Sequence, residues 1–356
     1  MRADKRGGDA NKQKWMEETV KVFQVEGGWT RENVRIGERP EPLPGPGEVR
    51  LKMKAASLNF RDLLVPLKGY GARMKALPLI LLSDGVGIVD AIGPEVSAPK
   101  LGERVCPLFF QSWSAGPPDE QRLGFSLGSE LDGTMAEYMV LPAKGVVPVP
   151  DFLSDAEAAT LPCAALTAWS AIIKEGCVRP GQKVLVQGTG GVSLFALQFA
   201  KLAGAFVIVT SSSDAKLERA RELGADATIN YKTTPEWGKS ARALVGGEGL
   251  DHIVEVGGQD TLPQSLRAIR PGGTVSMIGV LSGGMMDVRL GMIVTRHIRL
   301  QGITVGSRDD FLAMVRAVEC HRLRPEVDRI FAFGELPKAM DFLASGQHFG
   351  KLCIEH

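Results

Sequence analysis

From residue 183 onward, short runs of β-branched and other apolar residues alternate with helix-length amphipathic segments. This alternation constrains the fold more than any other feature of the sequence. Strands with nearly continuous apolar residues that alternate with helices are typical of a parallel sheet covered on both faces. The sequence therefore predicts a doubly wound α/β domain, which we place at residues 151–305. Its expected strands are KVLVQG (183–188), FVIVT (206–210), ATINY (227–231), HIVEVG (252–257) and GTVSMIGV (273–280).

The chain before residue 150 has a different pattern. It is rich in glycine, proline and short apolar runs separated by breakers such as PLPGPGE, which predicts a β-rich, turn-rich unit over residues 20–150. We expect residues 306–356, with one helix (311–321) and the strand-like tail FGKLCIEH, to complete this unit. Residues 1–19 read as a polar tail. A chain of 356 residues suits two such domains, and two domains create a cleft.

A glycine-rich turn joins the first expected strand of the α/β domain to the helix after it. Glycines at such a junction let the backbone approach a pyrophosphate at a helix N-terminus, where free N–H groups meet negative charge. Ser193 stands where the usual fingerprint has its third glycine. The turn predicts a dinucleotide site that includes Gly188, Thr189, Gly190, Gly191 and Val192.

The end of the second expected strand indicates which dinucleotide binds. An NAD site carries a carboxylate there for the ribose 2′-hydroxyl, whereas this chain has Ser211, Ser212 and Ser213, with Lys216 one turn into the next helix. Hydroxyls, a helix N-terminus and a lysine would hold a 2′-phosphate, so NADP(H) is the predicted cofactor. The alternative is that Ser213 caps the helix and Lys216 is a solvated surface residue.

Composition excludes several other classes of protein. Lys and Arg total 42 against 41 Asp and Glu, without long basic runs, which argues against nucleic acid or an anionic membrane as partner. Five scattered cysteines without a C-x-x-C pair favour a reducing, cytoplasmic location. No uninterrupted apolar run is long enough to span a membrane, and no secretory signal is readable. We therefore expect a small-molecule substrate.

Several motifs, in a fixed order, resemble the medium-chain dehydrogenase/reductase superfamily, and specifically its zinc-independent, quinone-oxidoreductase-like branch. They are PGPGEVRLKMKAASLNFRD, GVGIVDAIGPEV, LGERV, LPCAALTAW, GTGGVS, ARELGADATINY and GKLCI. The resemblance covers nearly everything from residue 20 to the end. It implies a GroES-like substrate domain, a Rossmann cofactor domain, and hydride transfer in the cleft between them.

The chain departs from the zinc alcohol dehydrogenases at their catalytic ligands. The first ligand position falls on Asn59, the His-Glu pair falls on Ser83 and Asp84, and Cys163 alone keeps a cysteine. A catalytic zinc normally has three protein ligands of N, S or O type. Cys106 is the only cysteine in residues 105–130, so the structural-zinc lobe is also missing. We therefore predict that no metal is bound.

Without a metal, hydrogen bonds must polarise the substrate carbonyl, a chemistry that suits quinones, enones and related conjugated carbonyls. By resemblance, Tyr70 is the candidate proton donor, although a surface tyrosine is the alternative. Asn59, Arg61 and Asp62 are polar residues in a segment that otherwise reads as buried, which favours a cleft-lining role over a structural network.

The resemblance also implies further cofactor contacts and an assembly. The cofactor contacts are Thr167, Tyr231, Gly257, Gly279, Val280 and Lys351, of which Tyr231 and Lys351 could instead be ordinary surface groups. A homodimer is expected to form through the apolar strand at 298–306, because an exposed edge is usually covered. Two alternative functions stay open at this stage: activity on simple alcohols or aldehydes, and a non-catalytic NADPH sensor on the same fold.

Overall fold

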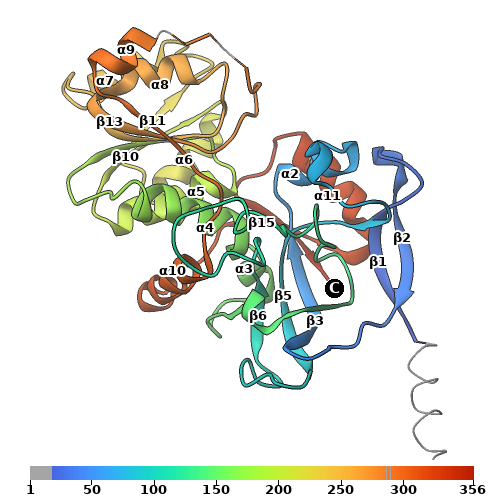
Figure 1. The fold of residues 1–356 in the computed structure, drawn as a ribbon. Helices are drawn as coiled ribbons and strands as arrows, with labels where there is room; N and C mark the ends of the chain where they lie inside the picture. Colours follow the sequence, from blue (N-terminus) through green and yellow to red (C-terminus); the bar gives the residue numbers. More distant parts are fainter. Residues whose placement is uncertain (1–17, 286, 289) are drawn as a thin grey trace, which may run out of the picture.

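The computed structural model describes residues 18–285, 287–288 and 290–356; the first 17 residues of the predicted polar tail lie outside them. Two lobes lie side by side (Figure 1). One contains the strands after residue 183, and the other contains the first strands of the chain together with its last segments. Among the described residues, no helix has the length and apolar character needed to cross a membrane.

A six-stranded sheet of the order β11-β10-β9-β12-β13-β14 forms the first lobe. Every neighbouring pair in it is parallel. This is the doubly wound, Rossmann-type order with a switch point between β9 and β12, as the alternation of strands and helices predicted. The strands are β9 (Lys183–Gln187), β10 (Phe206–Ser211), β11 (Ala227–Asn230), β12 (Leu250–Glu255), β13 (Ile269–Met277) and β14 (Arg299–Gly302).

Helices cover both faces of this sheet because alternate strand residues point to opposite faces. Val184 and Val186 of β9 pack in a cluster with Phe195 and Phe199, whereas Leu185 joins a second cluster on the other face. Each residue of this set is buried. The helices are α5 (Gly191–Leu202), α6 (Asp214–Glu222), α7 (Trp237–Leu244), α8 (Leu262–Ala268) and α9 (Leu290–Thr295).

The second lobe is mostly β structure. A seven-stranded sheet has the order β15-β16-β3-β5-β6-β8, with β7 on β3, and a smaller sheet has the order β2-β1-β4. The strands are β1 (Thr19–Val25), β2 (Val34–Pro40), β3 (Glu48–Ser57), β4 (Leu79–Ile80), β5 (Asp84–Ile92), β6 (Arg104–Pro107), β7 (Tyr138–Pro142), β8 (Val146–Pro148), β15 (Val327–Ala332) and β16 (Lys351–Glu355). This is the β-rich, turn-rich unit that the sequence predicted.

The last 50 residues divide between the lobes. The helix α10 (Arg308–His321) buries Phe311, Met314 and Val318 in the cluster that holds α4 (Leu166–Trp169) and α5. By contrast, β15, β16 and α11 (Leu336–Ala344) pack with the substrate lobe, where the red C-terminal segments lie beside the blue strands in Figure 1. The boundaries drawn at residues 150 and 306 stay predictions. Two short helices, α2 (Arg61–Leu64) and α3 (Asp155–Ala159), complete the set.

Candidate active site

The glycine turn between β9 and α5 has the conformation that its sequence requires. Gly188 has φ +73°, in the left-handed region that favours glycine. Gly190 is the N-cap of α5, and no heavy atom lies within 4 Å of the Cβ position there. Ser193, in place of the third glycine, is buried and donates its hydroxyl to the carbonyl of Gln187 at 2.7 Å. The hydroxyl therefore closes the turn and leaves the helix N-terminus open.

The end of β10 carries the serines that the sequence analysis singled out. Ser213 caps α6, since its hydroxyl accepts from the backbone N–H of Lys216 at 3.4 Å. Ser211 is buried, and its hydroxyl accepts from the N–H of Ser213 at 3.4 Å. Ser212 lies between them and is half-buried. Capping therefore holds as one role for Ser213, and it does not exclude phosphate binding.

Lys216 is not a free surface lysine. Its ammonium donates to the carbonyls of Gly346 at 2.7 Å and of His348 at 2.8 Å. These bonds tie α6 to the loop that leads into β16, and burial lowers the pKa of Lys216. Lys216 is therefore partly buried and tied to a distant segment, and its role toward a 2′-phosphate stays a prediction. A 2′-phosphate at this strand end would have to compete with two carbonyls for the same ammonium.

The loop before β16 also touches the glycine turn. Gly350 donates its N–H to the carbonyl of Thr189 at 2.9 Å, and Gly350 pairs with Gly190 as an isolated bridge. A Cβ at Gly191 would lie 2.3 Å from Cδ of Lys351. The C-terminal tail thus lies against the predicted phosphate turn, as the resemblance implied for Lys351.

The side chain of Lys351 extends past the turn, and its ammonium reaches the facing lobe. It donates to the backbone carbonyl of Leu58 and, at 2.6 Å, to Oδ1 of Asn59. Asn59 in turn donates from Nδ2 to Oδ2 of Asp84 at 2.9 Å, while the distance from Lys351 Nζ to Oδ2 of Asp84 is 3.9 Å. Lys351 is 3% exposed and Asp84 is fully buried. A buried cation and a buried anion are therefore linked through one amide.

By the resemblance, Asn59 and Asp84 stand at positions where zinc alcohol dehydrogenases hold their catalytic metal, and the residues present do not fit zinc. No cluster of three or more His, Cys, Asp or Glu side chains suited to a metal occurs in the described part of the chain. The amide oxygen of Asn59 already accepts from an ammonium, and a second cation beside it would be repelled. Ser83 offers a neutral hydroxyl, which leaves Asp84 and Cys163 alone as anionic ligands.

Burial shifts the ionisation of the acids in this cluster. The pKa of Asp84 is raised to about 7 by burial, which the nearby Lys351 partly offsets. Burial, and then the charge of Asp84, raise the pKa of the Cys163 thiol to about 12. A thiol with such a pKa stays protonated at neutral pH, so Cys163 is a poor nucleophile.

Arg61, Asp62 and Tyr70 lie together at the start of α2. Arg61 donates to the carbonyl of Leu127 at 3.1 Å and to the hydroxyl of Ser129 at 3.0 Å. Its guanidinium stacks over the Tyr70 ring, 5.1 Å from the ring centroid. Asp62 is buried and accepts from the N–H of Asn59 at 2.7 Å. These residues therefore form a network of hydrogen bonds and stacking next to Asn59, and a cleft-lining role for them stays a prediction.

Tyr70 is 41% exposed, so its phenol reaches solvent as well as Arg61. Burial raises its pKa, and the charge of Arg61 lowers it by less. The phenol is therefore protonated at neutral pH, which a proton donor requires.

The other predicted cofactor contacts are spread over the carboxyl end of the parallel sheet and the first helix of the lobe. Thr167 is buried in α4, whereas Tyr231 is 42% exposed just after β11. Gly257 and Gly279 follow β12 and β13, and a Cβ at Gly279 would lie 2.3 Å from the carbonyl of Val256. Val280 is 60% exposed. Ligands bind at the carboxyl ends of strands in such sheets, where all but Thr167 lie.

The sequence analysis missed a buried carboxylate at this sheet edge. Glu255 ends β12, is fully buried, and accepts five hydrogen bonds. The donors are Gln187 Nε2 (2.6 Å), Ser265 Oγ (2.5 Å), Thr261 Oγ1 (2.5 Å) and the backbone N–H groups of Gly257 (2.9 Å) and Gly258 (3.1 Å). Glu255 thus connects the residue before the glycine turn with the loop after β12. The signal for it was a charged residue inside the apolar run HIVEVG.

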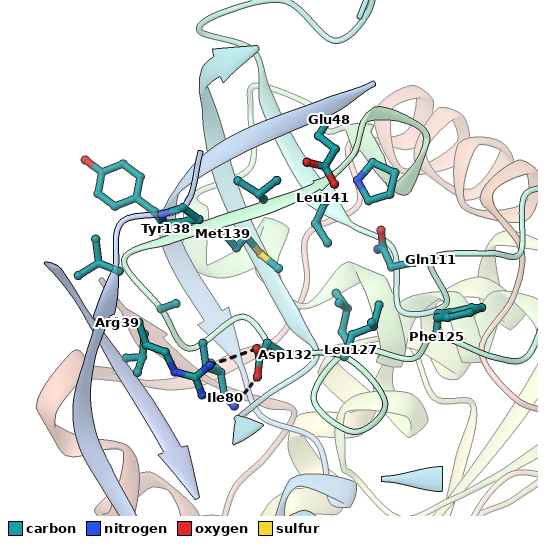
Figure 2. A pocket seen from close by; sticks show the side chains of 18 of the residues that line it. Arg39, Glu48, Ile80, Gln111, Phe125, Leu127, Asp132, Tyr138, Met139 and Leu141 are labelled. Carbon is teal, nitrogen blue, oxygen red and sulfur yellow. Dashed lines mark hydrogen bonds and ion pairs between the residues drawn. The ribbon is translucent and has the colours of Figure 1, made fainter. Parts of the chain in front are cut away.

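One hollow lies elsewhere, in the substrate lobe, and has a volume of about 630 Å³. Figure 2 shows Leu127, Met139 and Leu141 on its walls and the Arg39–Asp132 pair at its edge. Phe125 and Gln111 lie at the other end in this view. It contains none of the predicted catalytic or cofactor residues. Its size alone is no reason to place the chemistry there.

The fold and the site together define a class of protein: a two-lobed, pyridine-nucleotide-dependent oxidoreductase with an open glycine turn on one side and a polar cluster on the other. The chain belongs to the medium-chain dehydrogenase/reductase superfamily and is an alcohol dehydrogenase-like oxidoreductase. Residues 45–151 match the family model of the alcohol dehydrogenase GroES-like domain, and residues 191–319 match that of the zinc-binding dehydrogenases.

Similar proteins align with nearly the whole chain. A zinc-type alcohol dehydrogenase-like protein of Schizosaccharomyces pombe is 45% identical, over 89% of this chain and 93% of its own. The crystal structure of an NAD-dependent alcohol dehydrogenase, 35% identical, aligns with a TM-score of 0.86 over 94% of this chain and 99% of its own. The crotonyl-CoA carboxylase/reductase AntE, solved with NADP, is 26% identical with a TM-score of 0.82 over 95% and 94%. These solved relatives differ in the dinucleotide named for them.

Proposed function

We propose that this protein is a zinc-independent reductase that uses NADP(H) to reduce conjugated carbonyl compounds such as quinones, enones or enoyl thioesters. The observation that carries the proposal is the side-chain cluster at the metal-ligand positions. There, the amide of Asn59 lies between the ammonium of Lys351 and the carboxyl of Asp84. A site of this composition polarises a carbonyl through hydrogen bonds and fixed charges, without a Lewis acid.

The cofactor domain offers the groups that the dinucleotide needs. The open N-terminus of α5 with Gly188–Val192 would hold the pyrophosphate, and the end of β10 with Ser211, Ser212 and Ser213 would hold the adenosine ribose. The absence of a carboxylate at positions 211–213 favours NADP(H), because a carboxylate there would repel a 2′-phosphate. Thr167, Tyr231, Gly257, Gly279, Val280 and the stem of Lys351 are the further contacts that we propose.

The chemistry then divides between the two lobes. When bound, the reduced dinucleotide supplies a hydride to the electrophilic carbon of the substrate. Negative charge moves to the carbonyl oxygen, where the polar cluster of the facing lobe stabilises it. Tyr70 donates the proton that completes the reduction, and its contact with Arg61 fixes the phenol at the edge of the cluster.

The direct test follows NADPH and NADH absorbance with purified protein against quinones, enones, enoyl thioesters and aldehydes. We expect oxidation of NADPH with a conjugated carbonyl and a lower Michaelis constant for NADPH than for NADH. Equal or better use of NADH would overturn the cofactor proposal. Tight NADPH binding without turnover on any substrate would favour a sensor.

Simple alcohols are the second candidate substrates, because one solved relative is named an alcohol dehydrogenase. The same assay, run with NADP⁺ or NAD⁺ and ethanol or 2-propanol, decides between the two. We expect no rate above background, because hydrogen bonds and a single ammonium lower the pKa of an unactivated hydroxyl far less than direct coordination to a metal does. Alcohol oxidation that a chelator abolishes would contradict zinc independence.

The role of Tyr70 has its own test. Tyr70→Phe removes the phenolic proton, and we expect kcat to fall about 100-fold, in the range for loss of a general acid, with an unchanged Michaelis constant for NADPH. Tyr138→Phe is the control, because the phenol of Tyr138 points away from the cavity walls in Figure 2 and is no part of the Asn59 cluster. Full activity of Tyr70→Phe on every substrate would reject the role.

We also propose a homodimer. The strand β14 is the edge of the six-stranded sheet, and large apolar side chains beside it are exposed. They include Leu300 (37%), Leu290 (69%) and Val294 (71%). An open apolar edge of this kind is usually covered by a second strand. Light scattering at micromolar concentration should give twice the mass of one chain, and Leu300→Lys should shift it toward one chain.

A further inference from the structure

The side chain of Lys351 connects the two lobes of the site. Its stem passes the glycine turn so closely that only a hydrogen fits at Gly191. Its ammonium ends at Leu58 and Asn59, more than 290 positions away in sequence. The lysine therefore places a positive charge at the first of the former metal-ligand positions, whereas the stem alone faces the phosphate turn.

The ammonium has hydrogen-bonding capacity left. Of its three N–H groups, two donate to the Leu58 carbonyl and to Asn59 Oδ1. The nearest carboxylate oxygen, Oδ2 of Asp84, is 3.9 Å away, which is beyond hydrogen-bond distance. Oδ1 of Asp84 has no hydrogen-bond partner in the structure. Asn59 and Cys163 are only half-buried, so solvent reaches part of the cluster that they form with Asp84 and Lys351.

The neighbouring cation cannot take the same role. The guanidinium of Arg61 is held by Leu127 and Ser129 and lies over the rings of Tyr70 and Phe109. Its distance to Asp62 is 4.0 Å. Lys351 is thus the cation with a direct bond to the side chain at a ligand position.

We infer that Lys351 is a catalytic residue in its own right: its ammonium replaces the charge of the missing metal and donates its third N–H to the substrate carbonyl oxygen. This inference rests on the proposed function. The hydride adds to the electrophilic carbon of the enone. The electron pair of the carbon–carbon double bond shifts toward the carbonyl carbon, and the carbonyl pair shifts onto oxygen, which becomes an enolate oxygen beside Lys351. The ammonium keeps its protons, and the proton that completes the reduction comes from Tyr70.

Replacing the charge by an apolar side chain of similar length tests this directly. For Lys351→Met, we expect kcat on an enone to fall about 100-fold, as for removal of one oxyanion donor, with the dissociation constant for NADPH changed less than about threefold. Lys174→Met is the matched control, because Lys174 is half-buried and paired with Asp310 at 2.7 Å, outside the cluster. Its kcat should stay at the wild-type value.

Two outcomes would overturn the inference. One is an unchanged kcat for Lys351→Met. The other is a large loss of NADPH affinity with an unchanged kcat at saturation, which would make Lys351 a phosphate ligand. If wild-type protein reduces no conjugated carbonyl at all, the proposed function fails instead.

A second measurement starts from the wild-type protein and requires no turnover. In the wild-type complex with NADP⁺, we expect bound 4-nitrophenol, a mimic of the enolate oxygen, to ionise at lower pH than it does in water, as read from its absorbance. The same titration on Lys351→Met, where that variant folds, should lose the shift. A wild-type complex in which bound 4-nitrophenol ionises at the same or a higher pH contradicts a cation at the substrate oxygen.

Discussion

The two sides of the proposed active site are built from different materials. On the cofactor side, the turn between β9 and α5 offers backbone N–H groups, and its residues are consecutive in the chain. On the substrate side, the cluster of Asn59, Asp84, Cys163 and Lys351 consists of side chains from four distant segments. The helix itself positions the backbone N–H groups at its N-terminus, whereas buried side-chain charges are tolerated only when they are paired.

This difference teaches where substitution is tolerated. Residues of the cofactor side depend on the space around the backbone of the turn. They also depend on the hydrogen bonds of Glu255, which we call the frame beneath the turn. Residues of the substrate side depend on one another, because loss of one partner leaves a buried charge without compensation. Changes to the frame, to the turn and to the cluster should therefore differ in kind, and three substitutions separate them.

The largest effect is expected at the frame beneath the turn. Glu255→Ala leaves five donors without their acceptor, and we expect the free energy of unfolding to fall by about 3–5 kcal/mol. Urea denaturation measures this change. Glu248→Ala is the control, because that glutamate is 77% exposed and its pair with Lys183 should contribute at most about 1 kcal/mol. Equal losses for both variants would contradict the role of Glu255.

The next effect sharpens the comparison at the turn itself. Gly190 has φ −82° and open space at its Cβ position, so Gly190→Ala should fold with an unchanged Tm. The added methyl lies where a pyrophosphate would approach, and we expect NADPH affinity to fall about 100-fold by fluorescence titration. Gly334→Ala, also with open space at its Cβ position but far from the turn, is the control. Unchanged affinity of Gly190→Ala would move the phosphate site elsewhere.

The smallest effect concerns the charges of the cluster. The pKa of Asp84 is raised by burial from 3.8 to about 7, so the native state favours the protonated acid. The stability that this proton contributes is complete below about pH 4 and is lost as pH rises through 7. Asp84→Asn cannot ionise. For this variant we expect the free energy of unfolding to change less between pH 5 and pH 8 than in the wild type, by on the order of 1 kcal/mol, and the Tm to depend less on pH.

Asp226→Asn serves as the control for this titration, because Asp226 pairs with Lys201 at the surface. Its profile should follow that of the wild type. A wild-type Tm that rises steadily from pH 4 to pH 7, with no difference in Asp84→Asn, would show that Asp84 does not titrate in this window.

Much of the cofactor side could be predicted from the sequence. The order of strands and helices, the glycine turn and the cap at Ser213 all follow from local patterns, since each depends on residues within one or two turns of the chain. The bonds of Lys216 could not be predicted in this way, because the carbonyls of Gly346 and His348 come from a loop 130 or more positions later. Glu255 was missed for a similar reason, since its donor Gln187 comes from β9, 68 positions earlier in the chain.

The sequence by itself determined the two domain types, the backbone-built turn, and the absence of the usual ligand residues at positions 59 and 83. Only the tertiary structure decided that the ammonium of Lys351 meets Asn59 beside Asp84. Local patterns specify backbone conformation through sterics and hydrogen bonds between near neighbours. The pairing of buried charges depends instead on which distant segments share a sheet, and here β16 lies next to β3 and brings the last lysine of the chain to the site.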